Sequence, residues 1–371
     1  MQKDSRIYIA GHRGLVGSAI LKNLKDNGYF NLITRSHKNL DLTSEPAVAT
    51  FFEKEKPEYV FLAAAKVGGI LANNNYRADF IYQNLMIQNH VIHQSYIHNV
   101  KKLLFLGSTC VYPKNCPQPI KEEYLLSNSL EYTNEPYAIA KIAGMKMCES
   151  YNLQYKTDFI SVMPTNLYGP NDNFNLETSH VLPALLRKIY LGKSLEMGNW
   201  KAIKNDLNTR PIEQIDGEAG NEKILEILKK YGIYKTGQRV VVEIWGSGEP
   251  MREFLWSEDM ADACVFLMKN ISFRNIVDQF LNNEDFTEIR NSHINIGTGN
   301  ELSIKQLAYL IKKIIKFQGE FFFNTEKPEG TMRKVTDISR LHELGWTHTV
   351  SLNEGIERLY ANLRKSEVPV A

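Results

Sequence analysis

The chain has 371 residues, of which 43% are apolar and 23% charged, as is ordinary for a globular protein with a substantial core. Its net charge of +2 indicates neither a nucleic-acid partner nor binding to an acidic membrane surface. The four cysteines form no CxxC pair and have no histidine cluster beside them, which argues against a metal site or a disulfide framework. No apolar stretch is long enough to span a bilayer and no signal-type segment opens the chain, so we expect a cytoplasmic protein without a membrane partner.

The first half of the chain alternates short apolar runs with helical patterns. Val16, Ile20 and Leu24 recur at helical spacing, and similar patterns follow each later run. Continuous apolar runs are typical of strands that are buried on both faces of a parallel sheet. The predicted strands are Ile7–Ala10, Leu32–Thr34, Tyr59–Leu62, Leu103–Leu106 and Phe159–Val162. This alternation predicts an α/β fold of the Rossmann type, with a doubly wound parallel sheet.

A glycine motif lies between the first predicted strand and the first predicted helix, at Gly11, Gly14 and Gly17. Small residues there let a pyrophosphate approach the backbone N–H groups at the positive end of the helix. Arg35 directly follows the second predicted strand, at the position where an acidic residue would instead bind the ribose 2′-hydroxyl of NAD. Arg35 and Arg13 can bind a 2′-phosphate through charge-assisted hydrogen bonds, so we expect NADPH. We expect further cofactor contacts at the adenine from Asp41 and Leu42 and, after the third strand, from Ala64 and Ala65.

Three polar residues predict the chemistry. Tyr137 and Lys141 are four residues apart, on one face of a predicted helix, and Ser108 follows the fourth strand. An ammonium beside a phenol favours the phenolate, so we expect Lys141 to lower the pKa of Tyr137 from its usual ~10. Tyr137 can then exchange a proton with a carbonyl or alcohol, while Ser108 shares the substrate oxygen and Lys141 binds the nicotinamide ribose. The set predicts an NADPH-dependent oxidoreductase.

Six further segments form distinctive motifs, namely Ala63–Ile70, Leu106–Pro113, Asn134–Lys141, Pro164–Pro170, Ser179–Pro183 and Pro250–Phe254. Together they resemble the GDP-L-fucose synthase family of extended short-chain dehydrogenases. The similarity extends from about Ile7 to Trp346 and is interrupted mainly at 199–238. The resemblance implies 3,5-epimerisation of a GDP-linked 4-keto-6-deoxy sugar followed by NADPH-dependent reduction at C4. It also implies a homodimer, formed through the helices that contain 81–96 and 137–151.

The resemblance implies that Cys110 and His180 form the acid/base pair for epimerisation. A C4 ketone acidifies the protons at C3 and C5, so a base and an acid can invert each centre through an enolate. A cysteine and a histidine both titrate close enough to neutrality for this role.

The same resemblance implies further binding residues. Lys188 and Arg252 are expected at the diphosphate, Trp245 over a base or sugar, and Glu329 at sugar hydroxyls. Asn166 is expected beside the sugar or the nicotinamide. The remaining cofactor contacts are expected from Leu15, Val16, Leu106, Gly107, Pro164, Leu167 and His180.

After Pro170 the pattern becomes less regular, which predicts a smaller α/β domain that binds the substrate. We expect the cofactor domain to cover 1–170 with a returning segment at 250–272, and the substrate domain to cover 171–249 and 273–371. The segment 199–238 is expected to be a surface insertion with one short amphipathic helix near Ile224, and Ser303 and Gln306 predict a capping box.

Two other functions remain open at this level. The first is a reductase that acts only at C4, on a GDP-linked 4-keto-6-deoxy heptose, because the insertion precedes Trp245 and can reshape the substrate site. The second is a non-enzymatic NADPH-binding regulator, against which the complete Ser-Tyr-Lys set argues. A 4,6-dehydratase is disfavoured, because the acidic pair expected after the active serine is replaced by Thr109 and Cys110.

Overall fold

The computed structural model describes residues 1–281, 288–327 and 330–365, and the chain divides into two compact units. Unit 1 comprises Met1–Asn171, Glu253–Asn300 and Lys334–Thr349. Unit 2 comprises Asp172–Arg252, Glu301–Arg333 and the chain from Val350. The segments 273–300 and 334–349, which the sequence pattern assigned to the substrate domain, therefore belong to unit 1.

Unit 1 is built on a six-stranded sheet in the order β10-β5-β4-β3-β1-β2. Each neighbouring pair in this sheet is parallel, which confirms the predicted Rossmann-like α/β fold. The strands are β1 (Ile7–Ala10), β2 (Leu32–Ile33), β3 (Tyr59–Leu62), β4 (Lys102–Leu106), β5 (Phe159–Pro164) and β10 (Ile294–Ile296). Because β10 pairs with β5 along Ile294–Ile296, the returning chain extends the sheet, and the returning segment is longer than predicted.

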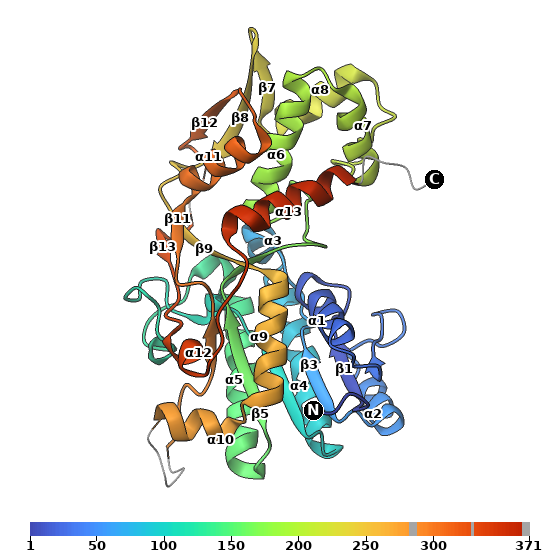
Figure 1. Cartoon of the computed structure of the whole chain (residues 1–371), viewed down its shortest axis with the longest axis vertical. Helices are drawn as coiled ribbons and strands as arrows, with labels where there is room; N and C mark the ends of the chain where they lie inside the picture. The colour runs from blue at the N-terminus through green and yellow to red at the C-terminus, as the bar shows by residue number, and fades with distance from the viewer. Residues whose placement is uncertain (282–287, 328–329, 366–371) are drawn as a thin grey trace. The chain divides into compact units, whose positions relative to one another are not determined.

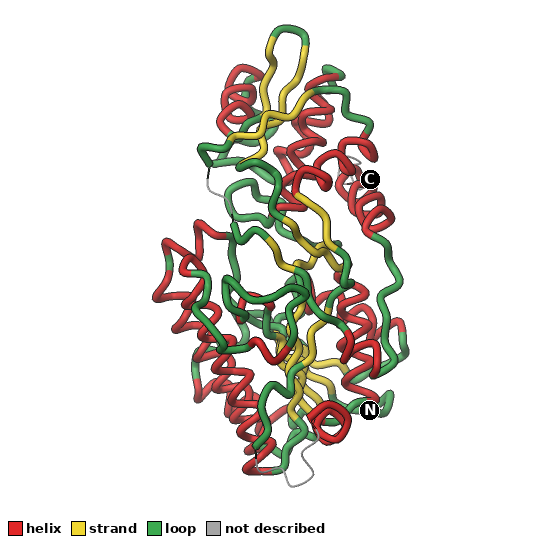
Figure 2. Tube along the Cα trace, turned by 90° about the vertical axis from the view of Figure 1, so that its left-hand side faces the viewer, coloured by secondary structure: helices red, strands yellow, loops and turns green. Residues whose placement is uncertain are grey.

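Helices cover both faces of this sheet (Figures 1 and 2). Ile7 and Ile9 pack into the cluster that includes α1 (Leu15–Asp26) and α9 (Ser257–Asn270). Tyr8 and Ala10 face the opposite way, into the cluster with the remaining large helices. These are α2 (Glu45–Glu55), α4 (Arg77–Ile97) and α5 (Glu135–Tyr155). The alternation explains why the strands read as continuous apolar runs.

Shorter elements connect this framework. In unit 1 they include α3 (Ile70–Asn75), η1 (Thr109–Val111), η2 (Glu122–Tyr124), η3 (Tyr132–Asn134), β6 (Asn166–Tyr168), α10 (Phe273–Ile276), η4 (Val277–Leu281) and α12 (Ser339–Glu343). The strand β9 (Met251–Trp256) pairs with β6 in parallel, with Asn166 opposite Phe254.

Unit 2 contains a three-stranded sheet in the order β12-β8-β7. The strands are β12 (Glu320–Asn324), β8 (Arg239–Trp245) and β7 (Ile233–Thr236), with β12 parallel and β7 antiparallel to β8. Its helices are α6 (Val181–Glu196), α7 (Trp200–Thr209), α8 (Asn221–Lys230), α11 (Ile304–Ile315) and α13 (Leu352–Lys365). The described residues also include the short strands β11 (Glu301–Ser303) and β13 (Arg333–Lys334). The capping box is confirmed, because Ser303 Oγ accepts from Gln306 N at 3.0 Å and Gln306 Oε1 accepts from Ser303 N at 2.8 Å.

The insertion at 199–238 is more ordered than the sequence indicated. It holds α7 as well as the predicted helix, which is α8, and it ends in the strand β7. Asn199 Oδ1 accepts from Ala202 N at 3.1 Å and so caps α7, while Ile203 and Leu207 are buried. The reading as a surface excursion with a single helix was wrong, because these apolar residues pack inside unit 2 despite the many charges around them.

A buried ion pair joins the insertion to α6. Arg187 is fully buried, and its guanidinium contacts Asp206 Oδ2 through Nε at 2.9 Å and through NH2 at 2.7 Å. Arg187 also donates to the carbonyl oxygen of Phe174 at 3.0 Å. The two contacts with Asp206 neutralise its buried carboxylate, which a substitution of Arg187 would leave uncompensated.

Replacing Arg187 with Leu should lower the free energy of unfolding by about 3 kcal/mol, the lower end of the range for breaking a buried pair. The cost stays at that end because Arg210 also contacts Asp206, at 3.4 Å. Urea unfolding of the purified variant measures the change. A double variant in which Asp206→Leu accompanies Arg187→Leu should recover part of the loss, and equal stability of the single variant and the unmodified chain would contradict the prediction.

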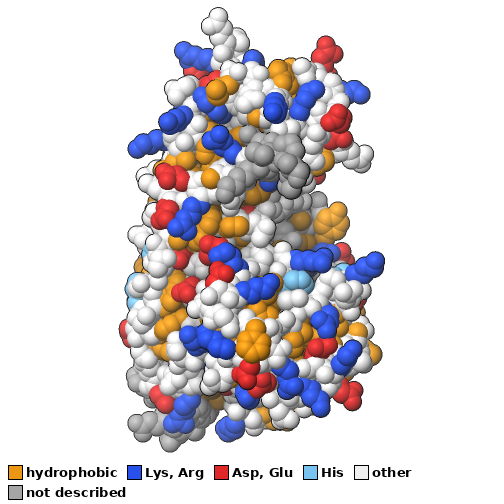
Figure 3. Space-filling model, turned by 45° about the vertical axis from the view of Figure 1, so that its right-hand side comes forward, with side chains coloured by type: hydrophobic (Ala, Val, Ile, Leu, Met, Phe, Trp, Pro, Cys, Tyr) orange, Lys and Arg blue, Asp and Glu red, His pale blue; other side chains and the backbone are white. Residues whose placement is uncertain are grey.

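Charged side chains of both signs are interspersed over the face shown in Figure 3, as expected from the net charge of +2. Within the described residues, no helix is both long and apolar enough to cross a membrane. The same residues contain no group of three or more His, Cys, Asp and Glu side chains arranged to hold a metal ion.

Candidate active site

The glycine motif forms a tight passage at the end of β1. Gly11 has φ of 84°, and a Cβ there would lie 2.7 Å from the backbone nitrogen of Ala64. A Cβ at Gly17 would lie 2.2 Å from the carbonyl oxygen of Gly11, so both positions require glycine. Gly14 stands at the N-terminal cap of α1, in which Leu15 and Val16 form the first turn. The positive end of α1 is therefore open to a phosphate group, and these residues fit a dinucleotide.

Arg35 and Arg13, the two residues expected at the 2′-phosphate, differ in their surroundings. Arg35 NH2 contacts Glu55 Oε1 at 2.6 Å, and its NH1 donates to the carbonyl oxygen of Thr34 at 2.8 Å. The guanidinium also lies 5.6 Å from the centre of the Phe51 ring. Arg13 is exposed in the glycine loop. These contacts fix the orientation of Arg35 after β2, and its role toward a 2′-phosphate stays a prediction.

Cofactor preference tests this pair. The unmodified chain should favour NADPH over NADH, and replacing Arg13 and Arg35 together by Ala should reduce the preference by at least about tenfold, through loss of charge-assisted hydrogen bonds. The ratio of kcat/KM for the two cofactors measures it. A Lys3→Ala variant, which removes a basic side chain that lies 4.2 Å over the Tyr29 ring, is the control and should leave the ratio unchanged. Equal kinetics with both cofactors in the unmodified chain would refute the assignment.

The predicted adenine contacts lie in a turn after β2. Asp41 Oδ1 accepts from the Thr43 backbone nitrogen at 2.9 Å and from its hydroxyl at 2.7 Å. These hydrogen bonds, that of the hydroxyl foremost, lower the pKa of Asp41. The carbonyl oxygen of Leu42 lies 3.1 Å from His90 Nδ1. The turn is therefore fixed by its own contacts, and its role toward adenine stays a prediction.

The helix α5 carries Tyr137 and Lys141 on one face. Lys141 is 3% exposed, and its Nζ donates to the carbonyl oxygen of Leu106 at 2.7 Å. The ammonium lies 5.8 Å from the centre of the Tyr137 ring and 4.8 Å from that of Phe105. Burial lowers the pKa of Lys141 to about 8. The structure thus brings Tyr137 and Lys141 together at the carboxyl end of β4.

The expected direction of the Tyr137 pKa was wrong. Burial raises the pKa of Tyr137, and the nearby Cys110 raises it further. Lys141 is not among the causes of this shift, and its ammonium is buried and donates to the carbonyl oxygen of Leu106 rather than to the phenol. A phenol that keeps its proton is suited to donate one to an oxygen that gains negative charge.

Ser108 and Cys110 belong to one short turn that follows β4. The Ser108 hydroxyl accepts from the backbone nitrogen of Cys110 at 3.3 Å and caps η1. Gly107 precedes it and is closely packed, since a Cβ there would lie 2.3 Å from Met163 Sδ. Burial raises the pKa of Cys110, whereas the charges of Lys334 and Lys141 act to lower it. The thiol therefore lies where two cations favour its anion against the cost of burial.

The next strand places the remaining cofactor residues of unit 1. Pro164 ends β5, and Asn166 and Leu167 follow in β6. Asn166 Nδ2 donates to the carbonyl oxygen of Glu253 at 2.9 Å, which fixes its side-chain orientation. Because β1, β3, β4 and β5 are parallel, the predicted cofactor residues that follow them gather at one edge of the sheet.

Three of the residues expected at the nucleotide sugar, Lys188, Trp245 and Arg252, lie in unit 2. Lys188 on α6 donates to the carbonyl oxygen of Glu243, and burial lowers its pKa to about 8. Trp245 ends β8 with 50% of its surface exposed. Arg252 NH1 donates to the carbonyl oxygen of Met251 at 2.8 Å. Each of these residues is a candidate to contact a ligand.

Two further expectations concern His180 and Glu329. His180 is exposed at the N-terminal cap of α6, in unit 2, while Cys110 belongs to unit 1. Their pairing in one reaction therefore stays a prediction. Glu329 lies outside the described residues.

The sequence analysis did not predict three residues that lie near the candidate site residues. Asn84 is buried, and its Oδ1 accepts from the Lys66 backbone nitrogen at 2.9 Å, which fixes the chain after β3. Lys327 Nζ lies 5.7 Å from the centre of the Trp245 ring and adds a cation there. The charge of Lys334, which comes 224 positions later in the chain, acts to lower the pKa of Cys110. A polar residue within a predicted buried helical face could have indicated Asn84, but no local pattern marks the two lysines.

The sheet, the glycine passage and the Ser-Tyr-Lys set define a dinucleotide-dependent enzyme of the Rossmann type. The model of the NAD dependent epimerase/dehydratase family matches residues 7–210 and 217–280, and the chain belongs to this family. A putative GDP-L-fucose synthase 2 of Arabidopsis thaliana is 49% identical over 97% of this chain and 92% of its own length. The GDP-L-fucose synthase of Escherichia coli is 45% identical over 96% of this chain and 95% of its own. The solved structure of MlghC, a GDP-mannoheptose C4 reductase from Campylobacter jejuni with NADP bound, is 46% identical, with a TM-score of 0.85 over 98% of this chain and 99% of that one.

Proposed function

We propose that this chain is an NADPH-dependent 3,5-epimerase/4-reductase that acts on a GDP-linked 4-keto-6-deoxy sugar. The observation that carries the proposal is the placement of Cys110, Ser108, Tyr137 and Lys141 around the carboxyl end of one strand. Ser108, Tyr137 and Lys141 serve a reduction, and the thiol adds the group that an epimerisation needs. The identity of 49% and 45% to GDP-L-fucose synthases supports the same substrate class.

In the reductive step, Tyr137 donates its proton to the C4 oxygen. NADPH, when bound, supplies the hydride that converts the ketone at C4 to an alcohol. Ser108 shares the same oxygen through its hydroxyl, and Lys141 holds the nicotinamide ribose. The raised pKa of Tyr137 keeps the phenol protonated until negative charge develops on the oxygen beside it.

In the epimerisation that precedes it, a base takes the proton from C3 or C5 and the electron pair moves into an enolate. An acid then returns a proton from the opposite side, so that the centre is inverted and no electrons are gained or lost. Cys110 as thiolate and His180 are the proposed partners. Burial raises the pKa of Cys110, and the charges of Lys334 and Lys141 act against this and favour the anion, which supports its role as the base.

A second candidate is a reductase that acts only at C4, on a GDP-linked heptose. The specific observation in its favour is the 46% identity to the Campylobacter GDP-mannoheptose C4 reductase. The insertion of α7, α8 and β7 within unit 2 supports this alternative too, since it precedes Trp245 along the chain. A regulator without activity is disfavoured, because holding Lys141 buried beside Tyr137 carries a desolvation cost that a binding protein need not bear.

The proposal includes a homodimer formed through α4 and α5. Both helices expose large apolar side chains, among them Tyr82 and Ile97 on α4 and Ile139 on α5. A cytoplasmic location belongs to the same proposal, and the four free cysteines support it.

Incubation with GDP-4-keto-6-deoxymannose and excess NADPH, with NMR analysis of the product, tests the function. The epimerase/reductase yields the inverted configurations at C3 and C5 together with an alcohol at C4. The reductase alone yields the C4 alcohol with the original configurations. Absence of NADPH oxidation with both this hexose and the corresponding heptose would contradict both candidates.

A further inference from the structure

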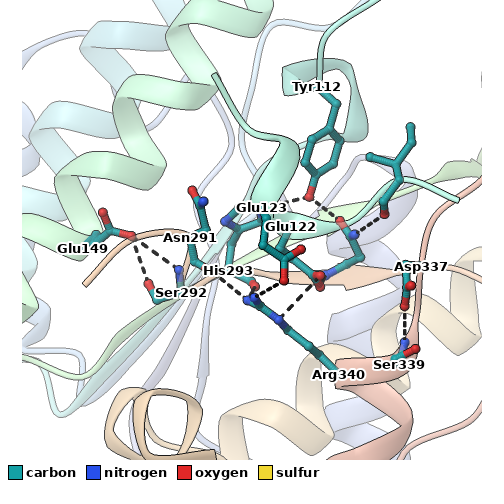
Figure 4. Close-up of polar contacts among 12 residues, drawn as sticks. Tyr112, Glu122, Glu123, Glu149, Asn291, Ser292, His293, Asp337, Ser339 and Arg340 are labelled. Atoms are coloured by element: carbon teal, nitrogen blue, oxygen red, sulfur yellow. Dashed lines mark hydrogen bonds and ion pairs between the residues drawn. The ribbon is translucent and has the colours of Figure 1, made fainter. Parts of the chain in front are cut away.

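Tyr112, which follows the Cys110 turn in the chain, belongs to a buried polar network of unit 1, drawn in Figure 4. It connects the residue after the turn to β10, η2 and α12. Its buried members are Tyr112, Glu122, His293, Asn295 and Arg340. None of them is among the groups assigned above to cofactor, substrate or proton transfer.

Tyr112 closes the turn that bears the thiol. Its backbone nitrogen donates to the carbonyl oxygen of Thr109 at 3.3 Å, and the backbone nitrogen of Val111 donates to the carbonyl oxygen of Ser108 at 3.2 Å. A single 3₁₀ turn has weak hydrogen bonds and does not fix its own orientation. The orientation of Cys110 therefore depends on β4 before the turn and on Tyr112 after it.

The side chain of Tyr112 is anchored at its hydroxyl. The hydroxyl donates to Asn295 Oδ1 at 2.5 Å and lies 2.9 Å from His293 Nε2. Since the hydroxyl has a single proton, it accepts from His293 Nε2–H, which leaves Nδ1 as the bare nitrogen. His293 Nδ1 has no hydrogen-bond partner among the described residues, and burial lowers the His293 pKa, in agreement with a neutral ring.

Asn295, which accepts from the Tyr112 hydroxyl, is itself fixed by further hydrogen bonds. Asn295 Nδ2 donates to the carbonyl oxygen of Ile120 at 2.9 Å, which turns Oδ1 toward Tyr112. The backbone nitrogen of Asn295 donates to Glu122 Oε1 at 3.0 Å, and Glu122 Oε2 lies 3.6 Å from Arg340 Nε. Arg340 NH1 also donates to the carbonyl oxygen of Asn291 at 2.6 Å.

The same segment fixes the chain that carries Lys334. The backbone nitrogen of Ile120 donates to the carbonyl oxygen of Val335 at 2.8 Å, and the Val335 nitrogen donates to Gln118 Oε1 at 2.9 Å. One buried framework therefore supports both the Cys110 turn and the residue whose charge acts on it. Packing alone would require only the aromatic ring of Tyr112, and not the hydroxyl that contacts Asn295 and His293.

We propose that Tyr112 is a positioning residue, which acts through Asn295 and the Glu122–Arg340 pair to hold the Cys110 turn. The inference rests on the proposed function only for what Cys110 does, and not for where it is held. Tyr112→Phe removes one hydroxyl and keeps the ring. The turn then relaxes, the thiol becomes more accessible, and its approach to the substrate carbon loses precision.

Alkylation by iodoacetamide, followed by mass spectrometry of the cysteine peptides, tests the placement without any substrate. In Tyr112→Phe, Cys110 should react at least about fivefold faster, while Cys148 and Cys264, which are buried in α5 and α9, stay as slow as before. The matched control is Tyr151→Phe, which removes a hydroxyl that lies 2.8 Å from His93 Nδ1. This control should leave the rate at Cys110 unchanged.

Deuterium exchange from solvent into C3 and C5 of GDP-4-keto-6-deoxymannose adds the functional readout. It should fall about tenfold in Tyr112→Phe, whereas the KM for NADPH stays unchanged. If the unmodified enzyme takes up no label, the proposed epimerisation fails and the alkylation rates alone decide on Tyr112. Equal acceleration at all three cysteines, or an unchanged rate at Cys110, would overturn the proposal. If Tyr112→Phe does not fold, Asn295→Ser withdraws the acceptor from the same hydroxyl and should give the same selective gain at Cys110.

Discussion

Replacing Tyr137 by Phe should lower the rate of C4 reduction by roughly 10²–10⁴, the usual scale for loss of a positioned proton donor. The change removes only the hydroxyl, and the ring can keep its contact with Phe80, 6.4 Å away between centroids. Binding of NADPH should stay nearly unchanged, because the glycine passage at Gly11 and Gly17 is separate from the phenol. Single-turnover oxidation of NADPH with a saturating 4-keto sugar nucleotide measures the effect.

Tyr151→Phe is the matched control for this variant, since it removes a phenolic hydroxyl from the same helix, α5. It should retain near-normal turnover. A Tyr137→Phe enzyme that reduces C4 at a comparable rate would show that another group protonates the oxygen. The role given to the raised Tyr137 pKa would then have no support.

Replacing Cys110 by Ser should suppress exchange at C3 and C5 by more than about 10², because a serine hydroxyl is far less acidic than a thiol and supplies far less anion at any given pH. Tyr137→Phe should affect the same exchange far less, since its phenol acts at C4. NMR of the substrate after incubation in D₂O without NADPH separates the two variants. Both variants keep the Ser108 hydroxyl next to position 110, so the difference between them reports on the thiol.

A Cys110→Ser enzyme that exchanges as fast as the unmodified one would remove Cys110 from the reaction. Cys116→Ser is the control, because that thiol is partly exposed and has no proposed role. It should leave both exchange and reduction unchanged.

Much of unit 1 could be predicted from the sequence because its signals are local. The runs from Ile7 and Tyr59 gave the strands, and the glycine spacing gave the turn into α1. The pair Tyr137 and Lys141 follows from helical spacing alone. These features depend on residues close together in the chain, where elementary geometry is decisive.

Contacts between distant segments could not be read in the same way. The strand β10 joins the sheet beside β5 across more than 100 residues, and a run of three residues, Ile294–Ile296, gives too short a pattern to assign. The helix α7 was missed because Asp206 is polar by type yet buried by its pairing with Arg187. The direction of the Tyr137 pKa was missed for a similar reason, since burial depends on the whole fold while spacing shows only the lysine.

The candidate site likewise combines residues with a local sequence signal and residues without one. Ser108, Tyr137 and Lys141 were found from order and spacing, and Cys110 and His180 only through resemblance. Lys334 and the anchor of Tyr112 at Asn295 carry no local signal, because each acts on the Cys110 turn from another segment of unit 1.

The most direct test of the proposed 3,5-epimerase activity is solvent-deuterium exchange in the unmodified enzyme, with GDP-4-keto-6-deoxymannose and no NADPH. We predict that deuterium enters C3 and C5 while the ketone stays intact. Because burial raises the pKa of Cys110, the thiolate fraction and hence the exchange rate should increase from pH 7 to pH 9. Unlabelled C3 and C5, under conditions where the same preparation reduces C4 once NADPH is added, would contradict the epimerase and leave the C4 reductase.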